Sequence, residues 1–347
     1  MPRSSLARPV LAVVAVAGLV GALSGTPAAG AGAPQGAVFA VNPVQSSGNE
    51  NLMDDKDSAT SVPASEYKSV PLTNLDGSGY LRGDWANVVT ATGKPVSAKT
   101  GYVFNRHDDG FEQVMAYYWV TQAQLYLQSL GFGAGGANGL RPVNKESQDV
   151  RLNQYGADNS FSWDKHDLLR FGKGGVDDAE DAEVIVHEYG HAVHDSQVPG
   201  FGSSEEAGSI GEAFGDYLSV SVGLWASAQN GWVPKTPPAC VADWDSISYT
   251  SEVPHCLRRL DAGLHYPADK SGEVHHDGTI WSQALWDIRT ALGDTEANRI
   301  IINAQFSFKA DTTFAAAATT TVKTAKDMYG QGAADAVTAA FHARGIL

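Results

Sequence analysis

Two histidines and three acids in the middle of this chain have the types and spacing of a metal site. His187, Glu188 and His191 stand in the order His-Glu-Tyr-Gly-His, and Glu212 and Asp216 follow after twenty intervening residues. Residues four apart project from one face of a helix, so the two histidine rings can hold one metal ion together. Glu188 projects about 100° away, where it can reach a water on the metal without binding the metal. The spacing predicts a zinc site in place of two solvated histidines.

With Glu212 as the third ligand, the metal would keep one coordination position for water, as catalytic zinc does. Zinc lowers the pKa of its water to about 7, and Glu188 would take the proton during attack on a carbonyl, then pass it to the leaving nitrogen. Asp216, one helical turn after Glu212, can accept a hydrogen bond from the free nitrogen of a ligating histidine and fix its tautomer. This chemistry is that of a hydrolase.

Three further histidines are candidates for the same site. His194 is a rival third ligand, but it would stack one turn beyond His191, so a positive charge at the helix C-terminus is the favoured interpretation. His275 and His276 precede a predicted helix, and one of them can stabilise the oxyanion formed on the scissile carbonyl. Taken alone, this pair is also compatible with ordinary surface histidines.

The N-terminus and the charge indicate a secreted protein. Residues 1–31 combine Arg3 and Arg8 with the apolar run Val10–Leu23 and small residues after it, which is typical of a cleaved signal peptide. A membrane anchor is the alternative, but the run is short for one. The formal charge of −15 becomes −17 without those two arginines. Such acidity disfavours nucleic acid and anionic membranes as partners and leaves calcium binding possible.

Cys240 and Cys256 are the two cysteines of the chain. In an oxidising compartment we expect them to form a disulfide that closes a loop of about 17 residues and contributes about 3 kcal/mol. Thiolate binding of a metal is the alternative, and it is disfavoured because the paired Cys-x-x-Cys spacing is absent.

The patterning predicts strands first and helices later. Residues 32–110 are rich in Gly, Ser, Asn, Asp and Thr around short apolar runs, which favours strands and loops. Helical periodicity or Ala-rich sequence covers four segments: 111–130, 180–195, 209–225 and 279 onward. We therefore predict an α+β fold in four parts: signal peptide 1–31, strand-rich segment 32–110, N-terminal lobe 111–195 ending in the zinc helix, and helical C-terminal lobe 196–347.

Acids and a glycine mark the predicted zinc helix. Asp177, Asp178, Glu180 and Asp181 surround its start, where they favour the positive end of the helix dipole, with calcium binding as the alternative. Gly190 costs about 1 kcal/mol inside a helix, so its presence predicts that another backbone packs closely against it.

The two metal segments resemble those of gluzincin metallopeptidases of the thermolysin and fungalysin group. Val186–Ala192 is similar to the fungalysin zinc helix, and Gly211–Tyr217 is similar to its third-ligand helix. The resemblance implies zinc held by both histidines of the first segment and by Glu212, with Glu188 as the catalytic acid and base. It also implies two lobes with the zinc helix at the cleft between them.

Weaker similarities suggest further site residues. Val274–Trp281 resembles the segment that carries the family's transition-state histidine, which favours His275 over His276. The segment beginning at Asn159 is similar to the substrate-binding edge strand, where the Asn159 amide would hold a peptide backbone; an Asn-Ser turn is the alternative. Arg258, in preference to Arg259, would contact the substrate carbonyl.

Three departures from this family stand out. No tyrosine lies between Tyr189 and Tyr217, so the tyrosine that assists the oxyanion in thermolysin has no counterpart there. Ala213–Gly215 replaces the usual fungalysin Gly-Trp-Ser. We also expect no long inhibitory propeptide after the predicted signal, although these enzymes usually carry one.

The combined prediction is a secreted zinc metalloendopeptidase that acts on peptides or proteins. A metalloaminopeptidase is one alternative, although the Gly-x-Met-Glu-Asn sequence that would anchor a free amine is absent. The other alternative is a secreted binding or surface protein with a structural zinc and no proteolysis.

Overall fold

The fold was determined as a computed structural model, which describes residues 32–91, 94–133, 135–137, 139–153 and 156–347. The predicted signal peptide over 1–31 lies outside the described residues. Strands predominate before residue 171 and helices after it, which confirms the predicted α+β order. None of the described helices combines the length and apolar character that crossing a bilayer requires.

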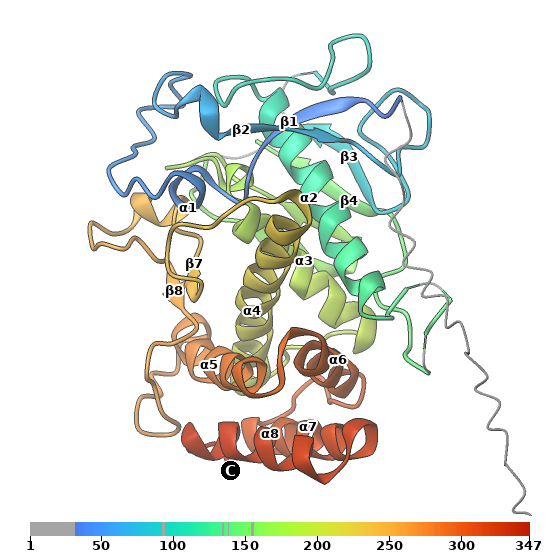
Figure 1. Cartoon of the computed structure of the whole chain (residues 1–347), viewed down its shortest axis with the longest axis vertical. Helices are drawn as coiled ribbons and strands as arrows, with labels where there is room; N and C mark the ends of the chain where they lie inside the picture. Colours follow the sequence, from blue (N-terminus) through green and yellow to red (C-terminus); the bar gives the residue numbers. More distant parts are fainter. Residues whose placement is uncertain (1–31, 92–93, 134, 138, 154–155) are drawn as a thin grey trace, which may run out of the picture. The chain divides into compact units, whose positions relative to one another are not determined.

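Short strands form the first half of the fold (Figure 1). An antiparallel pair and a four-stranded sheet in the order β3-β4-β6-β5 account for most of them. In the larger sheet β3, β4 and β6 run parallel, whereas β5 is antiparallel and lies at the edge. The strands and the short helix among them are β1 (Gln35–Phe39), α1 (Pro43–Ser47), β2 (Tyr67–Pro71), β3 (Ala86–Ala91), β4 (Gln148–Leu152), β5 (Phe161–Trp163) and β6 (Leu168–Arg170).

A long buried helix, α2 (Gly110–Ser129), contacts both groups of strands and lies where the 111–130 periodicity predicts it. Tyr117, Trp119 and Tyr126 are at most 1% exposed. Its aromatic side chains are therefore core, as expected. Gly131, with φ +104°, follows the end of this helix and supplies the left-handed backbone that a larger residue would resist.

The predicted zinc helix is α3 (Ala182–Gln197), and it begins where the Asp181 carboxylate accepts the backbone N–H of Glu183. The next helix, α4 (Glu205–Asn230), is longer than the predicted 209–225. Ser204 caps its N-terminus, and Gly231, with φ +69°, ends it. Both caps lie outside the apolar periodicity on which the prediction depended, so the prediction was too short at each end.

Gly190 of α3 packs against Gly215 of α4, as predicted from the cost of a glycine inside a helix. A Cβ at Gly190 would lie 2.9 Å from the Gly215 Cα, which real Cβ atoms do not approach. The two helices can therefore cross closely only because both positions lack side chains.

Four helices complete the C-terminal half: α5 (Val274–Leu292), α6 (Asp294–Gln305), α7 (Phe314–Tyr329) and α8 (Gln331–Ala343). Figure 1 shows α4 running from the strand-rich half to α5, with α7 and α8 beyond. The small hairpin of β7 (Cys240–Val241) and β8 (Arg258–Arg259) lies between α4 and α5 in the sequence. The predicted disulfide joins Cys240 to Cys256, whose Cα atoms are 5.2 Å apart.

Candidate active site

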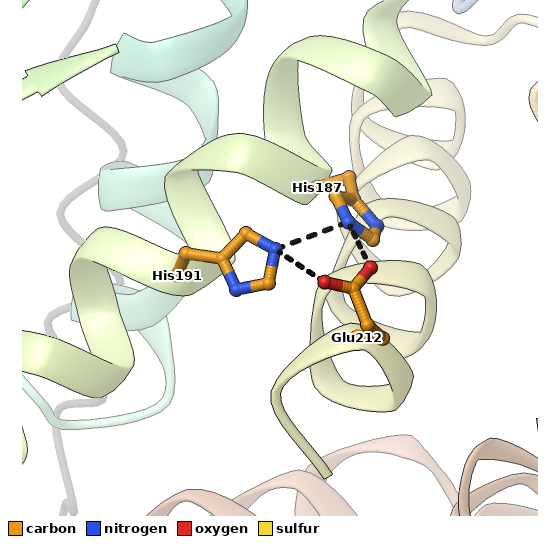
Figure 2. Close-up of side chains that lie close together, drawn as sticks. All are labelled: His187, His191 and Glu212. Atoms are coloured by element: carbon orange, nitrogen blue, oxygen red, sulfur yellow. Dashed lines mark hydrogen bonds and ion pairs between the residues drawn. The ribbon is translucent and has the colours of Figure 1, made fainter. Parts of the chain in front are cut away.

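Three donor atoms from α3 and α4 converge on one point (Figure 2). His187 Nε2 lies 3.2 Å from Glu212 Oε2 and 3.2 Å from His191 Nε2, and His191 Nε2 lies 3.5 Å from Glu212 Oε1. Tetrahedral ligands at zinc bond lengths stand about 3.3 Å apart. The spacing of the three donors therefore fits a single zinc ion.

His187 and Glu212 both present acceptor atoms to this point, which also fits a bound cation. His187 Nδ1 lies 2.8 Å from Asp216 Oδ1, so Nδ1 carries the hydrogen and Nε2 presents a lone pair toward the other donors. Glu212 Oε2 is buried and has no hydrogen-bond partner. A lone pair and a carboxylate oxygen that face each other need a cation between them. The donor set thus fits a resident zinc.

The pKa values of His187 and His191 are shifted in opposite directions. Burial would lower the pKa of His187, but the Asp216 and Glu212 carboxylates beside its two ring nitrogens raise it to about 10. Burial lowers the pKa of His191 to about 4. Protons therefore compete with a metal mainly at His187.

Arg258 of β8 holds Asp216 from the other side. Its Nε lies 2.6 Å from Asp216 Oδ2 and its second terminal nitrogen lies 2.7 Å from Oδ1. Burial would raise the pKa of Asp216, but Arg258 lowers it to about 2. One ionised carboxylate therefore binds both the Arg258 guanidinium and the imidazole of His187. The sequence suggested separate roles for Asp216 and Arg258; the structure connects them.

Glu188 faces the same cleft as the metal donors. Burial raises the pKa of its carboxyl to about 7. Its Oε2 is buried and has no hydrogen-bond partner. A carboxylate in this state can accept and return a proton near neutral pH.

His275 reaches the cleft from the first turn of α5, with its Nε2 3.4 Å from Glu212 Oε2. The Glu273 carboxylate caps this helix, accepting the backbone N–H groups of His275 and His276, so the helix begins at Val274 and not near Thr279. Glu273 Oε1 also lies 2.6 Å from His275 Nδ1. His276 contacts Asp277 instead and does not line the cleft.

The remaining candidates divide between cleft and surface. Asn159 lines the cleft, which has a volume of about 490 Å³, next to the edge strand β5. Arg259 pairs with Asp261 at the surface. His194 lines the cleft but is 2% exposed and stacks on Phe201, and burial lowers its pKa to about 3. His194 is therefore neutral, and the expectation of a helix C-terminal cation was wrong.

The acids around the start of α3 have different environments. Glu180 is buried and forms an ion pair with Arg106 at 2.9 Å. Asp181 accepts backbone N–H groups from three residues: Glu183, Trp244 and Asp245. Protein donors thus satisfy these two carboxylates. Asp178 instead faces the cleft beside Asp158 and Asp245, a grouping that the sequence did not indicate.

Comparison with known proteins gives an independent view of the fold and family. Residues 200–346 match the family described as "Thermolysin metallopeptidase, alpha-helical domain". The chain is 22% identical over 261 residues to Extracellular metalloproteinase 3 of Arthroderma gypseum, covering 72% of this chain and 36% of that protein. It is 23% identical over 177 residues to Extracellular metalloproteinase 9 of Uncinocarpus reesii, covering 46% and 23%. The chain therefore matches about a quarter to a third of the length of these relatives.

A solved structure shares the fold at low sequence identity. The precursor of protealysin, a metalloproteinase from Serratia proteamaculans, superposes with a TM-score of 0.54 and 18% identity, over 77% of this chain and 90% of that chain. Residues 200–346 are thus similar to the helical domain of thermolysin metallopeptidases, and most of the chain shares the fold of the protealysin precursor.

Proposed function

We propose that this protein is a secreted zinc metalloendopeptidase that hydrolyses peptide bonds in peptides or proteins. The observation that carries the proposal is the convergence of His187, His191 and Glu212 in one cleft beside Glu188, whose Oε2 has no hydrogen-bond partner. Secretion is supported by the signal-like residues 1–31 and by relatives that are named extracellular metalloproteinases.

Five side chains of the cleft have assigned roles in this reaction. The two histidines and Glu212 would hold zinc, which when bound polarises a water molecule and the substrate carbonyl. Glu188 accepts the proton of the attacking water and returns it to the leaving nitrogen, a task that a pKa of about 7 suits. Glu273 Oε1, 2.6 Å from His275 Nδ1, orients this ring in the cleft, where its Nε2 would stabilise the developing oxyanion.

The edge strand β5 provides a place for the substrate backbone. Phe161 and Ser162 of this strand line the cleft together with Asn159. An extended peptide can add to a sheet edge through main-chain hydrogen bonds, which bind independently of side-chain identity. This arrangement supports an endopeptidase, because the chain ends of the substrate need no anchor.

Replacing Glu188 by glutamine tests the assignment. The Glu188→Gln variant should bind one zinc with the affinity of the wild type, while kcat on a quenched peptide falls by about a hundredfold or more, because the proton acceptor is lost. Glu205→Gln is the matched control, since this acid is exposed in the first turn of α4, outside the cleft. A Glu188→Gln variant as active as the wild type would refute the role of Glu188.

The alternatives predict different results with the same reagents. An aminopeptidase would cleave peptides with a free N-terminus and leave blocked ones intact. A protein with structural zinc would hold the metal stoichiometrically but hydrolyse neither peptide, with or without a zinc chelator.

A further inference from the structure

Three aspartates surround a hollow in the wall of the active-site cleft. Asp158 precedes β5, Asp178 precedes α3 and Asp245 follows β7, yet one carboxylate oxygen of each lies within 4.8 Å of the others. Asp178 and Asp245 line the same cleft as Glu188. Gly175 borders the hollow with φ +65°, and a Cβ there would lie 2.4 Å from Asp158 Oδ2. A Cβ at Gly175 would also lie 2.4 Å from Ser248 Oγ, so a larger residue there would clash with both Asp158 and Ser248.

The two deeper carboxylates have acceptor atoms without donors. Asp178 and Asp245 are 2% and 4% exposed, and Oδ1 of each is buried without a hydrogen-bond partner. Asp178 uses only Oδ2, which accepts from the Ser160 hydroxyl and the Gly172 N–H. A buried acceptor without a partner keeps the full cost of its lost hydration, and this cost is larger when the group is charged. Both Oδ1 atoms could therefore accept hydrogen bonds from a ligand that carries N–H or O–H donors.

The described residues supply no cation to this hollow. Arg258 interacts electrostatically with Asp245, but its guanidinium is bound by both oxygens of Asp216. No ion pair involves Asp158, Asp178 or Asp245 in the described part of the chain. Burial, together with nearby Asp158 and Glu188, raises the pKa of Asp178 to about 8, and burial also raises the pKa of Asp245. The hollow therefore favours a positively charged occupant.

We propose that Asp158, Asp178 and Asp245 form an acidic subsite that binds a lysine or arginine side chain of the substrate next to the scissile bond. This inference rests on the proposed proteolytic function and names its substrate class. An ammonium or guanidinium group brings three or more N–H donors, which match the free acceptor atoms. Val184 and Leu257 line the same cleft and can contact the aliphatic stem of either side chain.

The proposed subsite lies close to Glu188, the proposed acid and base of the reaction. Asp178 is near enough to Glu188 for their charges to interact, and Arg258 interacts with both Glu188 and Asp245. A divalent cation is the competing occupant. Calcium takes six to eight oxygen ligands, whereas the described cluster offers three carboxylates and opens to the cleft, so a substrate side chain is favoured.

The test uses the zinc-loaded full chain and quenched peptides that differ at one residue on either side of the cleaved bond. Lysine, arginine, norleucine and glutamate are compared, because norleucine keeps the lysine stem without its charge. We expect kcat/KM for the lysine and arginine peptides to exceed that for norleucine by at least about tenfold. Asp245→Asn and Asp178→Asn should each remove most of this ratio. Asp164→Asn, an acid of the same cleft outside the hollow, should preserve it.

Each other outcome overturns the inference in an identifiable way. A wild type that prefers norleucine, with the same ratio in both aspartate variants, keeps the protease and removes the acidic subsite. Millimolar calcium that raises the melting temperature of the wild type but not of Asp245→Asn, without any preference for basic peptides, assigns the hollow to a metal. Failure of the zinc-loaded protein to cleave any peptide removes the proposed function and this inference with it.

Discussion

Replacing Asp216 by asparagine should weaken the metal centre and the fold together, because this carboxylate serves both. It is 1% exposed and accepts from Arg258 at 2.6 and 2.7 Å and from His187 at 2.8 Å. The amide keeps the shape of the carboxylate but loses its charge. Its nitrogen cannot accept from either partner, so at least one of these contacts is lost.

The expected loss of stability comes from the contact of Asp216 with Arg258, and the expected loss of zinc affinity comes from its contact with His187. The Arg258 side chain is 16% exposed, so Asp216→Asn leaves a largely buried guanidinium without its counter-charge, which costs about 3–5 kcal/mol. Loss of the carboxylate that orients a ligating histidine lowers zinc affinity by about 10- to 100-fold. A double variant, Asp216→Asn with Arg258→Met, removes the unpaired charge and should recover part of the stability without recovering zinc affinity.

Two measurements separate these effects. Urea unfolding of the metal-free proteins reports the ion pair, and zinc titration against a competing chelator reports the orientation of His187. Arg258→Met alone should lose stability while zinc affinity stays within a few-fold of wild type, because Asp216 still contacts the histidine. If Asp216→Asn kept the zinc affinity and the urea midpoint of the wild type, Asp216 would neither orient His187 nor stabilise the fold through Arg258.

Three further changes follow from the same structure. Gly215→Ala should lower zinc affinity, because the new Cβ would lie 2.6 Å from Nδ1 of His187. Gly211→Ala is the control: its Cβ would lie 3.6 Å from Nδ1 of His191, so this variant should bind zinc normally in the same titration. The buried carboxyl of Asp178, with a pKa of about 8 against 3.8 in the unfolded chain, keeps a proton that the unfolded chain releases, so its contribution to stability is complete below pH 4 and is lost as pH rises through 8. Over this pH range the urea midpoint of Asp178→Asn should therefore fall less steeply than that of the wild type. Equal slopes for the two proteins would contradict this account of Asp178. Replacing Cys240 and Cys256 by serine should reduce the free energy of unfolding by about 3 kcal/mol, and a reducing agent should reproduce the loss in the wild type but not in the variant.

The convergence of the proposed metal ligands could be predicted from the sequence because their geometry is mostly local. A separation of four residues on a helix fixes how His187 and His191 project, whatever the remainder of the fold does. Asp216 is similarly one turn from Glu212 on the next helix. Both pairs lie in the structure as this helical geometry requires.

The walls of the cleft could not be predicted in this way. Arg258 meets Asp216 across 42 residues of sequence, and the acidic hollow joins residues from before β5, before α3 and after β7. No periodicity relates such positions, and their meeting depends on how the loops pack. His194 shows the same limit, because its place on α3 suggested a charged helix end until packing against Phe201 proved it buried.

The metal centre ultimately depends on how closely two helices approach. Gly190 lets the α4 backbone come within van der Waals contact of α3, and Gly215 lies directly over the ring of His187, where a Cβ would meet Nδ1 at 2.6 Å. The glycines cost helix propensity, at about 1 kcal/mol each. In exchange, the short distance between the helices allows Glu212 and Asp216, from successive turns, to reach opposite nitrogens of the same imidazole. A wider crossing would leave the histidine pair intact but remove both carboxylates, so the glycines are as necessary to the site as its ligands.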